Sequence, residues 1–90
     1  MNFEWDARKA KVNLRKHGIS FEEATTAFRD PLAVTASDLT HSSNEHRFVT
    51  FGLSSKGKLL TISHTERGES IRIITARQST KRERKIYEEG

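Results

Sequence analysis

The fold is decided by residues 46–77, which read HRFVTFGLSSKGKLLTISHTERGESIRIITAR. β-Branched and aromatic residues dominate three segments of this stretch, and segments rich in Ser and Gly separate them. The pattern predicts three strands with two turns between them: His46–Ser54, Ser55-Lys56-Gly57, Lys58–Thr65, Glu66-Arg67-Gly68 and Ser70–Arg77. A fourth short strand is expected over Leu32–Ala36, followed by a polar loop over Asp38–Asn44. The sequence therefore predicts a small antiparallel sheet of three to four strands.

Side-chain alternation assigns the faces of this sheet, on the assumption of two-residue turns at Lys56-Gly57 and Arg67-Gly68. One face then carries mainly apolar side chains and is the expected core: Val49, Phe51, Leu53, Leu60, Ile62, His64, Ile71 and Ile73. The other is rich in hydroxyls and is expected to be partly wet: Thr50, Gly52, Ser54, Thr61, Ser63, Thr65, Ser70 and Arg72, with Phe48, Leu59 and Ile74 interleaved. A slip of one residue would exchange the faces of a strand.

A strongly basic helix is expected before the sheet, over Ala7–His17. Asp6 is a good N-cap and Gly18 is a good residue to end the helix. Its apolar positions are few, and no acidic residue occurs within it. The opposite face of this helix is basic and carries Arg8, Lys9, Lys11, Arg15 and Lys16.

Two further short helices are indicated by capping signals. Ser20 and Glu23 form a capping-box pattern, and the helix that they open ends at Asp30-Pro31. Its expected buried stripe consists of Phe21, Ala24 and Phe28. Thr80 and Glu83 repeat the capping-box pattern before a thinly apolar C-terminal helix. The whole chain is then an α+β domain in which two N-terminal helices pack on the sheet.

Composition excludes several classes of function. The 90 residues form one expected domain, residues 1–90, with 16 Lys and Arg against 12 Asp and Glu, a net charge of +4. Cysteine is absent, and no apolar run approaches the ~18 residues that span a bilayer, so a soluble cytoplasmic protein without disulfides is expected. Phosphate-loop, serine-hydrolase and zinc-protease motifs are missing, and none of the four histidines is paired at helical spacing. We therefore expect no cofactor and no metal site.

The arginines of the last hairpin and strand are the most informative charges. Arg67, Arg72 and Arg77 cluster there, and a guanidinium holds phosphate with two hydrogen bonds while keeping its own proton. Beside a hydroxyl-rich face they predict a groove that follows an RNA backbone. The expected RNA-binding cations are Lys9, Lys11, Arg15, Lys16, Lys81 and Arg84. The alternative is that the arginines are solvated edge charges or ion-pair partners of Glu45, Glu66 and Glu69.

Cleavage of RNA without a metal needs a base, positive charge on the phosphate and an acid. The candidate proton carriers are His17 at a helix end, then Glu83 and Tyr87, which are four residues apart on the last helix. Each has a structural alternative: His17 as a helix cap, Glu83 as the capping-box acid and Tyr87 as an anchoring aromatic. His64 falls on the predicted core face, where a hydrogen-bonded structural role is favoured.

Taken together, these residues resemble the BrnT family of toxins. The resemblance rests on Phe3-Glu4-Trp5-Asp6, on residues 16–24 (KHGISFEEA) and on residues 72–77 (RIITAR). It continues through Lys9-Ala10, Asn13, Phe28, Asp30-Pro31, Thr65-Glu66-Arg67, Glu83-Arg84 and Tyr87, and so covers nearly the whole chain. Position 75 is more often Ser in such sequences, a small departure.

The resemblance implies a RelE-like fold and a type II toxin that cleaves mRNA as a metal-independent endoribonuclease and arrests translation. The implied partner is a BrnA-like ribbon-helix-helix antitoxin, in a heterotetramer that binds operator DNA in the bacterial cytoplasm. The functional arginines of the family map onto Arg67 and Arg77, and Arg72 is a third candidate from the face assignment. The alternative is a catalytically weak or inactive binding module that acts through antitoxin binding and autoregulation of its operon.

Overall fold

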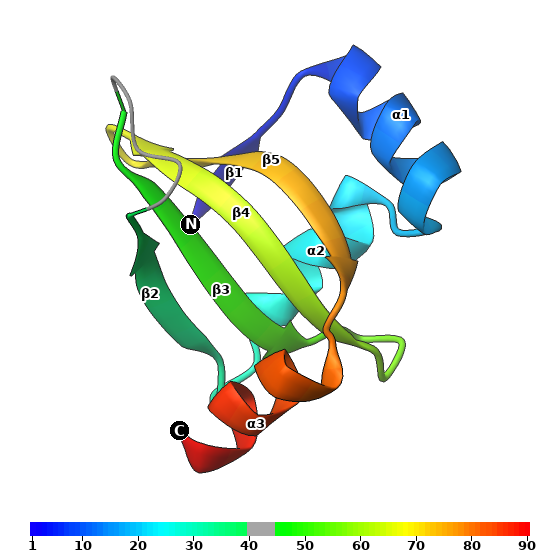
Figure 1. The fold of residues 1–90 in the computed structure, drawn as a ribbon. Coiled ribbons are helices and arrows are strands. Elements are labelled where there is room, and N and C mark those ends of the chain that lie inside the picture. Colours follow the sequence, from blue (N-terminus) through cyan, green and yellow to red (C-terminus); the bar gives the residue numbers. More distant parts are fainter. Residues whose placement is uncertain (40–44) are drawn as a thin grey trace.

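The computed structural model describes residues 1–39 and 45–90, which form a sheet of five strands with three helices (Figure 1). The elements are β1 (Asn2–Glu4), α1 (Ala7–His17), α2 (Phe21–Ala27), β2 (Val34–Asp38), β3 (Arg47–Leu53), β4 (Leu59–Arg67), β5 (Ser70–Gln78) and α3 (Lys81–Glu89). The predicted α+β class and all three helices are confirmed. Asp38 ends β2 instead of opening a loop, and the rest of the predicted loop lies mainly outside the described residues.

The sheet is mixed, so the prediction of an antiparallel sheet with three to four strands was wrong. Its strand order is β1-β5-β4-β3-β2, and β1 pairs in parallel with β5 through Phe3 opposite Ile71 and Glu4 opposite Arg72. A strand of three residues is too short to show alternation, which is why the sequence did not reveal it. The strand expected over Leu32–Ala36 is real but begins two residues later, at Val34.

The faces predicted for β3 are exchanged in the structure. Leu53 pairs with Leu59 and Thr50 with Ile62, because the β3–β4 turn has three residues instead of two. Ser54 N–H donates to the Lys58 carbonyl at 2.8 Å and so closes the turn. One additional residue shifts the register by one, which turns every β3 side chain to the opposite face. Phe48, Thr50 and Gly52 therefore face the core, whereas Val49, Phe51 and Leu53 share the face of Thr61, Ser63 and Thr65.

The face that β3 turns to the core allows α2 to pack closely against it. A Cβ atom at Gly52 would lie 2.5 Å from the Ala27 carbonyl oxygen, so only glycine lets α2 approach β3 this closely. Beside it, Thr50 Oγ1 and His64 Nε2 are hydrogen-bonded at 2.7 Å. Burial lowers the pKa of His64 to about 4, so this histidine is neutral at pH 7. Its predicted place in the core is confirmed.

A bulge in the β4–β5 hairpin aligns two of the arginines. The hairpin turns at Gly68 and Glu69, one residue later than predicted, and its register shifts between Ser63 and His64. His64 pairs with Ile73 but Ser63 pairs with Thr75, so Ile74 is the additional residue. Arg72 and Arg77 are an odd number of residues apart and would lie on opposite faces of a regular strand. The bulge brings both onto the face of Thr61 and Thr65.

The helix ends follow the capping signals, with one difference. Asp6 accepts hydrogen bonds from the N–H groups of Arg8 and Lys9, and Gly18 ends α1 with φ of 72°. At α2, Ser20 Oγ accepts from Glu23 N–H at 3.0 Å. A capping box also requires the Glu23 carboxylate to accept from the Ser20 N–H, and this second hydrogen bond is absent at α2. The carboxylate is buried and accepts instead from Ser54 Oγ at 2.8 Å, which ties α2 to the end of β3.

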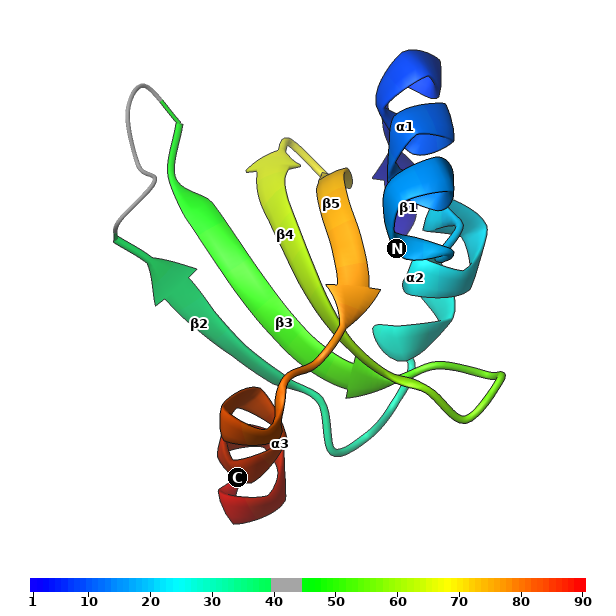
Figure 2. The same ribbon diagram turned by 45° about the vertical axis from the view of Figure 1, so that its right-hand side comes forward.

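The core lies between the sheet and the pair α1 and α2, whereas α3 lies on the opposite face of the sheet, where Thr61 Oγ1 donates to Glu83 (Figure 2). Asn13 is the buried polar residue that joins α1 to the sheet. Its Nδ2 donates to the carbonyls of Ile19 and Ala76 at 2.9 and 2.8 Å. Its Oδ1 accepts from Ala76 N–H at 3.1 Å. Because β1 pairs with β5 only as far as Arg72, the Asn13 amide occupies the place of a neighbouring strand at Ala76.

Asn13 is buried, so replacing it by Ala should destabilise the domain through the loss of its internal hydrogen bonds. The change leaves buried groups of Ile19 and Ala76 unpaired, which costs about 2 to 4 kcal/mol of the free energy of unfolding. Urea denaturation measures this decrease. Asn2→Ala, at an exposed position in β1, is the matched control and should change the free energy by less than about 0.5 kcal/mol. Equal effects of the two substitutions would contradict the role assigned to Asn13.

Candidate nucleic-acid interface

A basic hollow opens where β4 turns into β5, beside the first turns of α1. It has a volume of about 240 Å³ and is lined by Lys9, Glu45, Arg47, Thr65, Arg67, Arg72 and Ile74. Four of these side chains are cations and one is a carboxylate, so the hollow has an excess of positive charge. Arginine and lysine in a concave site attract phosphate and carboxylate groups. We call this site the basic hollow.

The acids around the basic hollow hold its arginines loosely. Arg67 Nη2 lies 2.9 Å from Glu45 Oε1, and both side chains are nearly half exposed, 49% and 47%. Arg72 Nη1 lies 2.9 Å from Glu4 Oε2, with side-chain exposures of 27% and 40%. Ion pairs this exposed contribute little to stability, so a phosphate can replace the carboxylates at small cost. Among the described residues, Lys9 and Arg47 form no ion pair.

A buried hydroxyl without a partner completes the basic hollow. Thr65 is 2% exposed, and its Oγ1 has no hydrogen-bond partner within the structure as described. Buried hydroxyls are nearly always hydrogen-bonded, because an unpaired one costs about 1 to 3 kcal/mol. A phosphate oxygen held between Arg67 and Arg72 would supply the missing acceptor. Thr65 is thus the residue of the hollow that most specifically indicates a ligand.

Arg77 lies at the other end of the same face and is held by a carboxylate. Its Nη1 and Nη2 donate to the two carboxylate oxygens of Glu83 at 2.7 and 2.8 Å. Glu83 Oε1 also accepts from Thr80 N–H at 2.9 Å and from Thr61 Oγ1 at 3.0 Å, so the predicted capping box of α3 is confirmed. The hydrogen bonds from Arg77 lower the pKa of Glu83 to about 2, and Glu83 in turn raises the pKa of Arg77.

A second contact holds the other end of α3. Tyr87 Oη donates to Asp30 Oδ2 at 2.6 Å, which raises the pKa of Tyr87. Asp30 Oδ2 also accepts from Leu53 N–H at 2.8 Å, so this contact joins α3 to the end of β3. Both Glu83 and Tyr87 therefore fasten α3, as their structural alternatives required. Whether either residue also transfers a proton stays a prediction.

The structure brings together only some of the predicted site residues. Arg67, Arg72 and Lys9 meet in the basic hollow. Arg77 lies five residues beyond Arg72 on β5, a separation of about 16 Å in an extended strand. His17 and Lys16 line a neighbouring groove. Four predicted cations lie elsewhere: Lys11 and Arg15 at exposed positions of α1 outside the hollow, and Lys81 and Arg84 at exposed positions of α3.

Several residues at the site, Thr65 among them, were not singled out from the sequence as site residues. Arg47 enters the hollow because it pairs with Thr65 across β3 and β4, and only the correct register reveals this. Glu4 belongs to β1, the strand that the sequence did not predict. Glu45 was considered only as an ion-pair partner of the arginines, and its contact with Arg67 confirms that interpretation.

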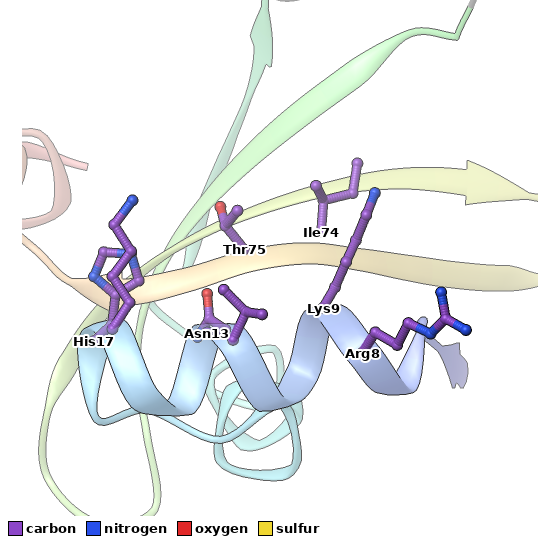
Figure 3. Close-up of a pocket in the computed structure, with 8 residues that line it drawn as sticks. Arg8, Lys9, Asn13, His17, Ile74 and Thr75 are labelled. Atoms are coloured by element: carbon purple, nitrogen blue, oxygen red, sulfur yellow. The ribbon is translucent and has the colours of Figure 1, made fainter.

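A groove between α1 and β5 adjoins the basic hollow, and Figure 3 shows residues that line this groove. It has a volume of about 320 Å³ and is lined by Arg8, Lys9, Val12, Asn13, Lys16, His17, Ile74 and Thr75. Lys9 and Ile74 line both sites, so the groove and the hollow are adjacent. We call this second site the α1–β5 groove. It brings His17 and Lys9 to the two ends of one depression.

Metal-ligand clusters and membrane-spanning helices are the remaining features to consider. Among residues 1–39 and 45–90, no group of three or more His, Cys, Asp and Glu side chains is placed to hold a metal ion. His41, one of the four histidines considered from the sequence, lies outside the described residues. In the same part of the chain, no helix has the length and apolarity needed to cross a bilayer.

These features define a small basic α+β domain with a hollow lined by four cations at one end of its sheet. The family model for the ribonuclease toxin BrnT of type II toxin-antitoxin systems matches residues 5–83. The chain therefore belongs to the BrnT family of ribonuclease toxins, as its resemblance implied.

Comparison with solved structures supports the fold. The structure is similar to the crystal structure of the Brucella abortus ribonuclease toxin BrnT, with a TM-score of 0.69 and 19% sequence identity. The similarity covers 90% of this chain and 99% of the Brucella chain. At this identity it shows a shared fold. No sequence match is found among curated proteins.

The contact between Arg77 and Glu83 holds α3 on the sheet, so loss of this contact should make α3 open more often. Glu83→Gln removes the charge-assisted bonds to Arg77, so the amide hydrogens of α3 should exchange at least about tenfold faster. Glu88→Gln, at an exposed acid of the same helix, is the control and should leave exchange unchanged.

Acid should have the same effect on the parent protein. The folded pKa of Glu83 lies below its ordinary value of 4.5, so its contribution to stability is complete above pH 4.5. The contribution disappears as the pH falls from 4.5 to about 2. Exchange rates of α3 that are equal in parent and Glu83→Gln proteins at pH 7, where the contribution of Glu83 is complete, would contradict this account.

Proposed function

We propose that the basic hollow binds the sugar-phosphate backbone of single-stranded RNA and cleaves it without a metal ion. The observation that carries this proposal is the group of four cations around the buried, unpaired hydroxyl of Thr65. Membership of a family of ribonuclease toxins supports RNA as the substrate. Arg67 and Arg72 present guanidinium groups that can take two oxygens of one phosphate, and Thr65 Oγ1 donates to a third.

The chemistry needs only side chains that line the basic hollow. The RNA 2′-oxygen attacks the adjacent phosphorus while the bond from phosphorus to the 5′-oxygen breaks, leaving a cyclic phosphate and a 5′-hydroxyl. The arginines stabilise the negative charge that develops on the phosphate, the contribution that a metal ion makes in other nucleases. When the phosphate takes Arg67 away from Glu45, that carboxylate is free to accept the 2′-proton. Lys9 donates the proton that the 5′-oxygen takes up.

Under this proposal the two ends of the sheet face have different tasks. The basic hollow performs the cleavage, and the contact of Arg77 with Glu83 holds α3 in place. Arg77, Glu83 and Tyr87 are not among the described residues that line the hollow, and the Arg77 guanidinium is held by Glu83. His17 lies in the α1–β5 groove and acts, if at all, on a neighbouring part of the strand.

The partners follow from family membership and from the resemblance of the sequence. A toxin of a type II system implies an antitoxin, and we propose a BrnA-like ribbon-helix-helix protein in this role. The complex is proposed to be a heterotetramer that binds operator DNA through the antitoxin. Cleavage of mRNA by the free toxin is proposed to arrest translation in the bacterial cytoplasm.

The experiment is cleavage of a defined single-stranded RNA by the antitoxin-free protein, with and without EDTA. We expect EDTA to change nothing. Arg72→Gln should reduce the rate about a hundredfold, since it removes a donor to the developing charge. Thr65→Val should reduce the rate about tenfold while leaving the free energy of unfolding equal or higher, because it removes an unpaired buried hydroxyl. Arg82→Gln, at an exposed arginine of α3, is the matched control and should retain the parent rate.

The outcomes separate the alternatives. Loss of cleavage in EDTA would contradict the metal-independent mechanism. Full activity of Thr65→Val and Arg72→Gln, together with loss in Arg77→Gln while α3 stays docked, would move the catalytic site to the other end of the sheet. Binding of RNA without cleavage, also with translating ribosomes present, would favour the inactive binding module.

A further inference from the structure

The α1–β5 groove differs in character from the basic hollow that it joins. It is lined by the apolar side chains of Val12 and Ile74, and Val12 is 57% exposed. Its rim carries cations, of which Arg8 and Lys9 are labelled in Figure 3. An apolar floor between positive rims is complementary to an apolar segment flanked by carboxylates.

RNA fits this groove less well than a protein segment does. Single-stranded nucleic acid is held by stacking on aromatic side chains and by charges along the backbone. Among the described residues, His17 is the only aromatic ring that lines the groove, and an exposed valine offers nothing to a phosphate. Val12 and Ile74 can instead bury the leucine-like side chains of a helix or an extended peptide.

The positive charge along α1 indicates that a segment bound in the groove carries acidic residues beside its apolar ones. No acidic residue occurs anywhere from Ala7 to His17, and the last turn of α1 is wholly basic, with Arg15, Lys16 and His17. Neither Lys9 nor Lys16 has an ion-pair partner among the described residues, so both can receive carboxylates from a partner. We infer that the α1–β5 groove docks an acidic, amphipathic protein segment, which inserts apolar side chains between Val12 and Ile74.

Docking there would block the basic hollow. Lys9 and Ile74 line both depressions, so a segment that fills the groove covers one wall of the hollow and pairs its lysine. RNA and the segment then compete for Lys9. This step rests on the proposed function, whereas the docking itself does not. The segment is the part of an antitoxin that would neutralise the toxin at this site.

The test uses a synthetic helical peptide with leucines at i, i+3, i+4 and i+7 spacing and glutamates between them. A second peptide carries serine in place of leucine and has the same charge. Fluorescence anisotropy should show tighter binding of the leucine peptide. Val12→Ser should weaken that binding by about fivefold to tenfold, because two methyl groups leave the buried contact. Leu14→Ser is the matched control, since Leu14 is 51% exposed on the same helix but outside the groove, and it should bind as the parent does.

RNA assays with the same proteins separate this inference from the proposed function. Val12→Ser should cleave RNA at the parent rate, and saturating leucine peptide should inhibit the parent protein. If the parent cleaves no RNA, the proposed function fails while the peptide results still test the groove. The docking inference is overturned if the leucine peptide does not bind, if the serine peptide binds equally well, or if Leu14→Ser weakens binding as much as Val12→Ser. Loss of RNA binding in Val12→Ser, without peptide binding, would assign the groove to RNA.

Discussion

The hydrogen bonds between the Asn13 side chain and the backbone of Ala76 are the constraint on which the rest of the structure depends. They satisfy the edge of β5 beyond the end of β1, where no strand is paired with it. They also fix the axial position of α1 against that edge. One turn before Asn13, Lys9 is thereby held beside Arg72 and Ile74. Both the basic hollow and the α1–β5 groove exist because this amide sets the distance between helix and strand.

The bulge at Ile74 determines what the sheet presents beside α1. It turns Arg72 and Arg77 to one face and so produces two basic positions at opposite ends of a row of hydroxyls. Their partners make these positions different. Arg67 and Arg72 each form one contact with a partly exposed carboxylate, which is easily exchanged, whereas Arg77 is held by both oxygens of a carboxylate that also caps α3. A ligand can displace the carboxylates from Arg67 and Arg72, whereas the contact of Arg77 with Glu83 is better suited to a structural role.

The sequence predicted what local chemistry determines. The caps at Asp6, Ser20 and Thr80 and the turn glycines placed the helices and most strands correctly. The faces of β3 were wrong because one turn residue decides them, and β1 was missed because its three residues have no pattern of their own. The same limits apply to the site. Arg67, Arg72 and Lys9 were named from their chemistry, whereas Arg47 and the unpaired hydroxyl of Thr65 required the tertiary register.

The central claim is that the basic hollow holds an RNA phosphate, and the salt dependence of binding tests it most directly. The affinity for a short single-stranded RNA with 2′-O-methyl groups, which cannot be cleaved, is measured over a range of salt concentrations. The slope of log K against log salt should become shallower by about 0.7 in Arg72→Gln for each phosphate that the side chain no longer neutralises. Arg82→Gln, on exposed α3, should retain the parent slope. An unchanged slope in Arg72→Gln would contradict the account.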